Sequence, residues 1–144
     1  MTLRFANVFG PRQEANLEGG VIAIFLDRLA AGEQTTIFGD GEQTRDFIYV
    51  GDVVSGVLDA IGHEGGVYNI GTGVETSINE LHAVCRRVTS IDREPAYEAE
   101  RPGEIRRSVT DPALAARELG WRAEKSLEEG LRLTWETLQE AGTG

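Results

Sequence analysis

The stretch GDGEQTRDFIYVGDV, residues 39–53, is the part of the sequence that says most about the fold. Glycines on either side of an acid favour a tight turn, and residues 45–50 that follow have the composition of a short strand. Arg45 opens this strand beside the apolar Phe47 and Ile48, where a guanidinium is costly to bury unless an anion meets it. The stretch therefore predicts a turn, a strand and an anion close to Arg45.

Strands and helices alternate along the chain in the pattern of its apolar residues. Helices are indicated where apolar residues recur every three or four positions, and strands where short β-branched or aromatic runs lie between turn residues. In chain order we expect a buried strand at 3–8, a loop at 10–20, a helix from Val21 to a C-cap at Gly32, strands at 35–38 and 45–50, and a helix that Asp52 caps and that runs through Ala60, with Val53, Val54, Val57, Leu58 and Ile61 turned inward. There follow a strand at 67–70, a helix with a Ser77–Glu80 capping box ending near Val88, an extended piece at 95–98, a helix with Asp111 as N-cap ending near Gly120, and a last amphipathic helix with a Ser126–Glu129 capping box and Leu127, Leu131, Trp135 and Leu138 on one stripe. This alternation predicts an α/β or α+β layered structure.

The composition excludes several classes of protein. With 144 residues, 40% of them hydrophobic, the chain can bury one core. A formal net charge of -10 argues against a nucleic acid or an anionic membrane as partner, because such binding needs clustered lysines and arginines. The single cysteine, Cys85, excludes an internal disulfide and a multi-cysteine metal site, and we expect it to fill a helix core.

The apolar runs are too short for a membrane protein. The longest one, residues 21–26, is far from the length needed to span a bilayer. The first residues, MTLRF, lack the charged and apolar blocks of a signal peptide. A cytoplasmic protein is the expectation.

The segment NIGTGVETS, residues 69–77, partly matches a dinucleotide-binding fingerprint. Gly71 and Gly73 have the required spacing, but Thr76 stands where a third glycine is needed, and no acid follows at a second strand end. Ser77, as the N-cap of the next helix, explains the turn without a ligand. We therefore do not assign a phosphate loop here.

Other polar residues lack the spacing of catalytic or metal sites. His63 and His82 have no serine, cysteine or acidic partner at a triad or metal spacing. Glu98 and Glu100 could be an acid/base pair, but alternating acids in an extended acidic segment are more typical of a solvated face. No metal site and no catalytic residue are predicted.

Two arginines stand apart, because each is attached to a rigid corner of the chain. Arg45 follows a glycine turn and Arg101 precedes a Pro-Gly pair. Such placement suits bidentate recognition of phosphate. Structural alternatives are open at this point: Arg45 could pair with Asp46 or Asp52, and Arg101 with Glu104.

Five segments taken together resemble the NAD-dependent epimerase/dehydratase family of nucleotide-sugar enzymes, which are extended short-chain dehydrogenases. They are LRFANVFGPRQ at 3–13, IFGDGEQTRDFIYVGDV at 37–53, VYNIGTG at 67–73, SINEL at 77–81 and RPGEIRRS at 101–108. The UDP-glucose 4-epimerase branch is nearest. The resemblance implies an α/β fold, with the last strands of a Rossmann-like sheet and a small α/β substrate-binding domain. Residues 1–144 would be the C-terminal, substrate-binding portion, with the N-terminal NAD-binding Rossmann part absent.

The resemblance also implies site residues, all directed to a UDP-sugar. Asn7 would hydrogen-bond a phosphate, Arg45 and Arg101 would clamp the pyrophosphate, Phe38 would pack on the uracil, the backbone at Val21 would contact the base or ribose, Glu104 would reach a ribose hydroxyl, and Phe5 and Val8 would border the nicotinamide. Ser108 would lie beside the C2 substituent of the sugar, where a small residue admits an N-acetyl group. The simpler alternative is a serine that only helps to end the loop before Asp111.

The family's catalytic motifs have no counterpart in this sequence. There is no GxxGxxG turn, and none of the three tyrosines is followed by a lysine in a Tyr-x-x-x-Lys pair. We expect the chain alone to hold a UDP-sugar, to bind no NAD, to be inactive and to be poorly stable. It would be half of a UDP-glucose/UDP-N-acetylglucosamine 4-epimerase, completed by a missing N-terminal half or a homodimer. The alternatives are part of a dehydratase or decarboxylase, and a stand-alone nucleotide-sugar-binding module.

Overall fold

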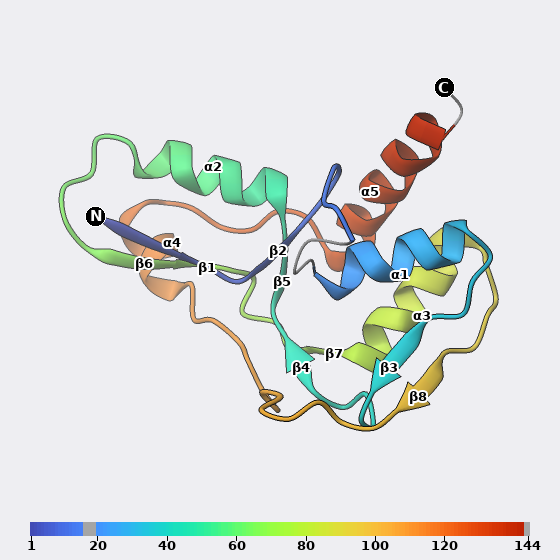
Figure 1. Ribbon diagram of the computed structural model, residues 1–144. Helices are drawn as coiled ribbons and strands as arrows, with labels where there is room; N and C mark the ends of the chain where they lie inside the picture. Colours follow the sequence, from blue (N-terminus) through green and yellow to red (C-terminus); the bar gives the residue numbers. More distant parts are fainter. Residues whose placement is uncertain (16–19, 143–144) are drawn as a thin grey trace.

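The computed structural model describes residues 1–15 and 20–142 and shows short strands interleaved with helices (Figure 1). Residues 16–19, part of the loop expected at 10–20, lie outside the described residues. The strands are β1 (Thr2–Phe5), β2 (Asn7–Phe9), β3 (Thr36–Phe38), β4 (Thr44–Arg45), β5 (Phe47–Tyr49), β6 (Val67–Ile70), β7 (Thr76–Ser77) and β8 (Ala96–Glu98). The helices are α1 (Val21–Ala30), α2 (Val50–Ala60), α3 (Ile78–Thr89), α4 (Ala113–Glu118) and α5 (Leu127–Gly142).

The strands pair across long stretches of sequence, and mostly in parallel. β1 pairs with β6, β2 with β5 and β3 with β8, all parallel, whereas β4 and β7 are antiparallel. Parallel neighbours need a crossover connection, and α1 and α2 lie on such connections. The α/β class predicted from the sequence is therefore confirmed.

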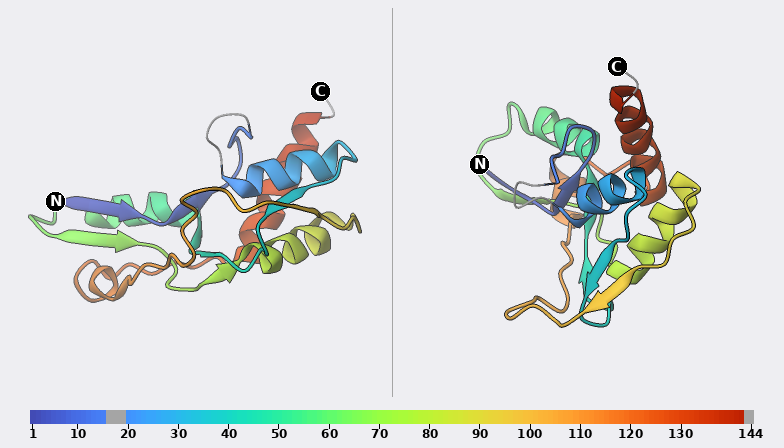
Figure 2. Two further views of the ribbon diagram at one scale, coloured as in Figure 1. Left: turned by 60° about the horizontal axis from the view of Figure 1, so that its bottom comes forward. Right: turned by 45° about the vertical axis from the view of Figure 1, so that its right-hand side comes forward.

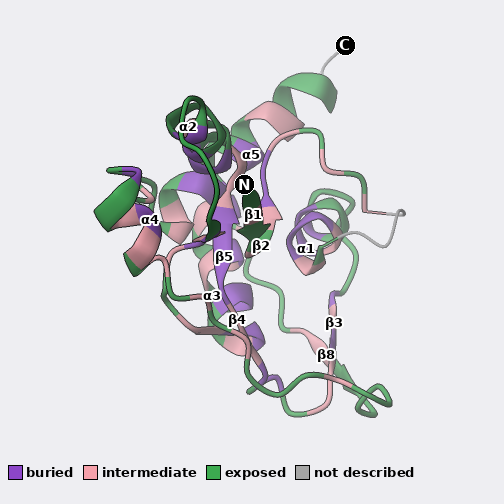
Figure 3. Cartoon of the chain, turned by 90° about the vertical axis from the view of Figure 1, so that its left-hand side faces the viewer, coloured by how far each residue is buried: buried purple, intermediate pink, exposed green. Residues whose placement is uncertain are grey.

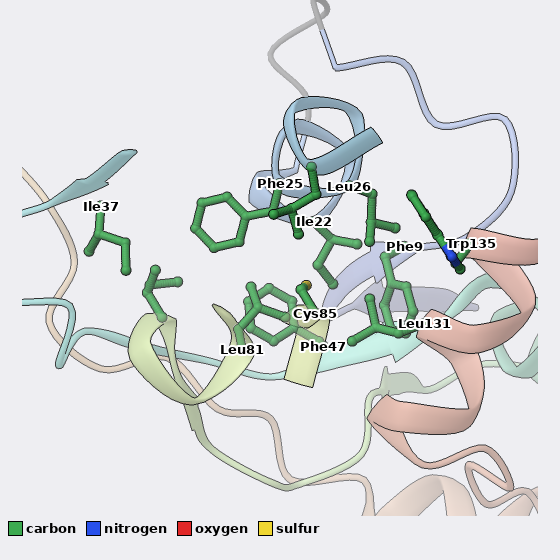
Figure 4. Packing of buried hydrophobic residues seen from close by; sticks show 12 residues of the cluster. Phe9, Ile22, Phe25, Leu26, Ile37, Phe47, Leu81, Cys85, Leu131 and Trp135 are labelled. Carbon is green, nitrogen blue, oxygen red and sulfur yellow. The ribbon is translucent and has the colours of Figure 1, made fainter. Parts of the chain in front are cut away.

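The buried apolar side chains form two clusters, and the neighbouring β5 residues Phe47 and Ile48 belong to different ones. The helices α2 and α4 lie toward one end of the ribbon, and α1, α3 and α5 toward the other (Figure 2). In the first cluster, α1, α3 and α5 pack around β2 and β5 (Figure 4). We call it the closed cluster; its buried members are Phe9, Ile22, Phe25, Leu26, Leu29, Ile37, Phe47, Ile78, Leu81, Cys85, Leu131 and Trp135. The second cluster joins α2, α4 and β6 and contains Ile48, Val53, Ala60, Tyr68, Ile70, Ala115, Leu119 and Trp121.

The expectations for the closed cluster are confirmed. Cys85 is fully buried, and burial raises the pKa of its thiol to about 12, so it acts as a small apolar side chain. Leu131 and Trp135 of α5 are buried. Both predicted capping boxes are present, since Ser77 exchanges hydrogen bonds with Glu80, and Ser126 with Glu129.

The expectation of one buried strand at 3–8 is wrong. The chain forms β1 and β2, separated at Ala6, and most of β1 is exposed, with residue Phe5 at 49% (Figure 3). β1 is hydrogen-bonded to β6 only, within the described residues, so its apolar composition does not translate into burial. The strand expected at 45–50 is also divided, at Asp46, and Val50 already belongs to α2.

The helix α2 departs most from expectation. It begins at Val50, so Asp52 lies in its first turn instead of capping it, and the buried Asp52 carboxylate accepts a hydrogen bond from the Lys125 N–H at 3.0 Å. Of the apolar residues expected to face inward, Val53 does. The others form an exposed stripe at helical spacing, which we call the open stripe: Val54, Val57, Leu58 and Ile61.

Two smaller points complete the fold. The helix expected after Asp111 starts at Ala113 with Pro112 as N-cap, and the Asp111 carboxylate accepts a hydrogen bond from the Ala113 N–H. In the described part of the chain, no helix is both long and apolar enough to cross a membrane.

Candidate functional site

One cavity collects most of the side chains that the sequence singles out. Its volume is about 490 Å³, within the range of small-molecule sites. β2, the start of α1, β3, the β4–β5 segment and the turn at 101–104 enclose it. Of the predicted site residues, it is lined by Asn7, Val8, Val21, Phe38, Arg45, Arg101 and Glu104.

Arg45 reaches the cavity from β4 and is held by three groups. Its guanidinium forms an ion pair with Glu104 and donates hydrogen bonds to the carbonyl oxygens of Thr44 at 2.7 Å and Ile105 at 2.6 Å. The alternative pairings of Arg45 with Asp46 or Asp52 are therefore wrong. The anion anticipated near Arg45 is, in the protein itself, the Glu104 carboxylate, and both side chains are largely shielded from water.

Arg101 lies against an aromatic ring. Its guanidinium carbon is 3.8 Å from the centroid of Phe38, a cation–π geometry. The suggested pairing of Arg101 with Glu104 is not seen, since the Glu104 carboxylate is used by Arg45. Arg101 and Phe38 both line the cavity, so this contact forms part of its wall.

Asp46, between β4 and β5, is a structural anchor that the sequence reasoning missed as such. The side chain is 1% exposed, and its carboxylate accepts hydrogen bonds from the N–H groups of Thr72 and Gly73 at 3.0 Å and of Thr110 at 3.3 Å. The hydroxyls of both threonines donate to it as well. The N–H groups of the glycine turn at 71–73 thus bind an internal carboxylate.

Gly71 shows how tightly this turn encloses the anchor. A Cβ atom on Gly71 would lie 2.0 Å from the Thr110 hydroxyl oxygen and 2.7 Å from an Asp46 carboxylate oxygen. Only a glycine allows that approach. An aspartate ahead of a buried strand, together with a later glycine turn, is the sequence signal that could have indicated this contact.

The segment 101–110, which carries Arg101 and Glu104, is also held by ion pairs at the protein surface. Arg106 pairs with Asp40, and Arg107 with Glu75. Hydrogen bonds from these arginines lower the pKa of Asp40 and of Glu75 to about 2. The segment therefore has a defined position beside β4.

Two predicted site residues lie outside the cavity lining. Phe5 is exposed on β1, and Ser108 is half-buried, with its N–H donating to the Thr44 carbonyl at 3.2 Å. Their predicted roles toward nicotinamide and sugar stay predictions. Glu98, Glu100 and His63 are exposed.

His82 is a core residue, as its lack of catalytic spacing suggested. Its ring is buried, lies edge-on to Phe25 and shares a hydrogen bond of 2.7 Å with the Thr35 hydroxyl. Burial lowers the pKa of His82. Among residues 1–15 and 20–142, no group of histidine, cysteine, aspartate and glutamate side chains could hold a metal ion.

Comparisons with known proteins agree on one family. The model of the NAD dependent epimerase/dehydratase family matches residues 1–71. The chain is 46% identical over 133 residues to the UDP-glucose 4-epimerase of Mycolicibacterium smegmatis, an alignment that covers 91% of this chain and 42% of that protein. The chain thus spans less than half the length of this curated relative.

Solved structures give the same result. A crystal structure of UDP-glucose 4-epimerase with UDP-glucose from Thermotoga maritima is 46% identical, with a TM-score of 0.94 over 96% of this chain and 45% of that one. A UDP-N-acetylglucosamine 4-epimerase from Methanobrevibacter ruminantium, in complex with UDP-N-acetylmuramic acid, is 36% identical, with a TM-score of 0.90 over 96% and 46% of the two chains. The architecture is accordingly part of a Rossmann-like epimerase fold.

Proposed function

We propose that this chain, a relative of the NAD-dependent epimerase/dehydratase family, forms the UDP-sugar-binding part of a nucleotide-sugar 4-epimerase. One observation carries the proposal: Arg45 and Arg101 reach the same cavity, from β4 and from the turn after β8, with Phe38 and Asn7 beside them. In a chain with a net charge of -10, such a concentration of guanidinium groups around a cavity suits a small polyanion.

The contacts of each arginine suggest how a diphosphate would be held. Guanidinium groups bind phosphate oxygens through paired N–H donors, and two of them match the charge of a diphosphate. Arg45 is already oriented by the Thr44 and Ile105 carbonyls, so a phosphate would compete for it only with Glu104. The uracil would pack on the ring of Phe38, which lines the same cavity as the arginines.

Asn7, Val21 and Glu104 complete the proposed site. Asn7 and Glu104 would hydrogen-bond a phosphate and a ribose hydroxyl, and the backbone at Val21 would contact the base or ribose. All three line the cavity. We further propose UDP-glucose and UDP-N-acetylglucosamine as the substrates of the complete enzyme, the second because Ser108 is small.

The catalytic part of the reaction would depend on groups that this sequence does not contain. It has neither the GxxGxxG turn nor the Tyr-x-x-x-Lys pair. Bound NAD would supply hydride transfer, and Val8 and Phe5 are the residues of this chain that would border its nicotinamide. The apolar, half-exposed ring of Phe5 suits a flat partner. The chain alone would bind the nucleotide sugar, but it would neither bind NAD nor catalyse the epimerisation of the sugar.

The open stripe on α2 would receive the NAD-binding part. Contiguous apolar surface of this kind marks an interaction site, and the relatives contain a further half of comparable length. A decarboxylase or dehydratase would share this arrangement. A non-catalytic binding module would share the cavity only, and the lack of a Tyr-x-x-x-Lys pair in the sequence favours it as second candidate.

Calorimetric titration of the 144-residue chain with UDP, uridine and NAD tests the proposal. We expect UDP to bind, NAD not to bind, and Arg45→Ala or Arg101→Ala to weaken UDP binding by about 2 to 3 kcal/mol, the loss for a charge-assisted hydrogen bond. Uridine binding should change little. Arg93→Ala, at an exposed position outside the cavity, is the matched control.

Two results would count against the proposal. Absence of UDP binding by the unmodified chain would remove the nucleotide-binding role. If the arginine variants weakened uridine binding as much as UDP binding, both arginines would be structural.

A further inference from the structure

Gln13, in the loop between β2 and α1, has a buried oxygen without a partner. It lines the cavity, its Nε2 donates to the Val8 carbonyl at 3.3 Å, and its Oε1 is buried with no hydrogen-bond donor among the described residues. Among those residues, it is the one buried side-chain polar atom without a partner. A buried acceptor left without a donor is costly, and most such atoms in proteins are satisfied.

The orientation of the Gln13 amide is fixed by its neighbour. If nitrogen and oxygen were exchanged, Oε1 would face the Val8 carbonyl oxygen, and two acceptors would oppose each other. The donor end therefore belongs on Val8, and the acceptor end faces elsewhere.

Gly20, the N-cap residue of α1, leaves space for this amide. A Cβ atom on Gly20 would lie 3.0 Å from Nε2 and 3.5 Å from Oε1 of Gln13. The first distance is closer than side chains normally tolerate. The amide is thus packed between β2 and the start of α1, at the wall of the cavity formed by these two elements.

The charged groups occupy a different wall. Arg101 lies on Phe38 of β3, and Arg45 of β4 is tied to Glu104 and Ile105. A nucleotide sugar bound with its base on Phe38 and its phosphates on the arginines would have two neutral parts left, the ribose and the glycosyl ring. Glu104 is proposed to take a ribose hydroxyl, which leaves the glycosyl ring for the wall at Gln13. That ring is rich in hydroxyl donors, which is what the Gln13 oxygen lacks.

We propose that Gln13 is a specificity-determining residue that accepts a hydrogen bond from a hydroxyl of the glycosyl group of the bound UDP-sugar. The inference rests on the proposed function, since it needs a nucleotide sugar in the cavity. In the complex, the glycosyl hydroxyl would supply the donor that the Gln13 oxygen lacks in the protein alone.

The test compares Gln13→Leu with the unmodified chain by calorimetry, using UDP-glucose, UDP and uridine. Losing one hydrogen bond to a neutral donor should weaken UDP-glucose binding about tenfold, or about 1.4 kcal/mol, and leave UDP and uridine within about twofold. Gln139→Leu, at an exposed position on α5, is the matched control. Gln13→Glu, which keeps an acceptor oxygen there, should retain more discrimination between UDP-glucose and UDP than Gln13→Leu does.

Thermal unfolding without ligand gives a second, independent measurement. Gln13→Leu removes the unpaired acceptor, which favours stability, and the donor to the Val8 carbonyl, which opposes it, so its Tm should stay close to that of the unmodified chain. A purely structural glutamine would give a lower Tm and equal losses for all three ligands, which would overturn the inference. Loss of uridine binding would place the donor on the base or ribose and equally refute a glycosyl contact. If the unmodified chain bound neither UDP nor UDP-glucose, the proposed function itself would fall.

Discussion

The helices of the closed cluster and the helix α2, which carries the open stripe, have the same spacing of apolar residues. Their apolar side chains nevertheless lie in opposite environments, buried in the first case and exposed in the second. Leu81 of α3 and Leu131 of α5 are 0% exposed, whereas Leu58 of α2 is 60% exposed and Ile61, directly after it, 72%. α2 also buries Val53 and Ala60 in the second cluster, so it is apolar on two sides. A helix with two apolar sides is typical of a position between two layers. Periodicity thus identifies the apolar side of a helix but not what covers it.

The largest difference between these regions should be in stability. Leu131→Ala removes a fully buried side chain and leaves a cavity, so we expect a loss of about 3 kcal/mol in the free energy of unfolding. Leu58→Ala should change it by less than about 0.5 kcal/mol. Urea denaturation of both variants measures this. Equal losses would mean that α2 is covered in solution, for example by a second copy of the chain.

A titratable group, His82, lies edge-on to Phe25 of the closed cluster, whereas the open stripe contains no titratable group. Burial lowers the folded-state pKa of His82, so the unfolded chain takes up a proton more readily. The free energy of unfolding should have its full value above about pH 6.5, the ordinary pKa of histidine, and should fall as the pH drops below it. The midpoint of urea unfolding, measured at pH 7.5 and pH 5.5, reports this.

Two variants separate His82 from other causes of that pH dependence. His82→Gln, which retains a hydrogen-bonding partner for Thr35, should show a weaker decline between the two pH values. His63→Gln, at an exposed position, should keep the full decline. If both variants behaved like the unmodified chain, carboxylates elsewhere would be responsible.

The smallest change in stability is expected on the open stripe itself. Ile61→Lys should alter the free energy of unfolding by no more than about 0.5 kcal/mol, because the side chain is exposed. It should nevertheless reduce concentration-dependent association, which exposed apolar surface promotes. Light scattering over a concentration series provides the measurement. Unchanged association would show that the stripe is not a contact surface in the isolated chain.

Local signals in the sequence predicted local structure well. The capping boxes at Ser77 and Ser126 depend on residues three positions apart, and both are present. The buried position of Cys85 followed from its general preference. The gathering of Arg45 and Arg101 at one cavity, by contrast, was expected only from the family resemblance, because no local pattern relates residues so far apart.

The failures share a cause, which is that burial depends on neighbours distant in sequence. β1 has an apolar composition but pairs only with β6 in the described part of the chain. Asp52 is a residue type that often caps helices, yet its carboxylate accepts a hydrogen bond from the N–H of Lys125, 73 positions away in the sequence. Gln13 was not singled out at all, because an unpaired oxygen is visible only once its surroundings are known.

The buried Asp46 carboxylate couples two distant parts of the chain, the turn at 71–73 and Thr110. Its backbone donors Thr72 and Thr110 lie 26 and 64 positions away in the sequence, and they lose their acceptor in the same event. A single local opening would therefore release the turn at 71–73 together with Thr110, at the end of the segment that carries Arg101 and Glu104. Backbone amides that share one opening also share one free energy of exchange with solvent. The amides of Thr72, Gly73 and Thr110 should therefore exchange with similar protection, although they are far apart in the sequence.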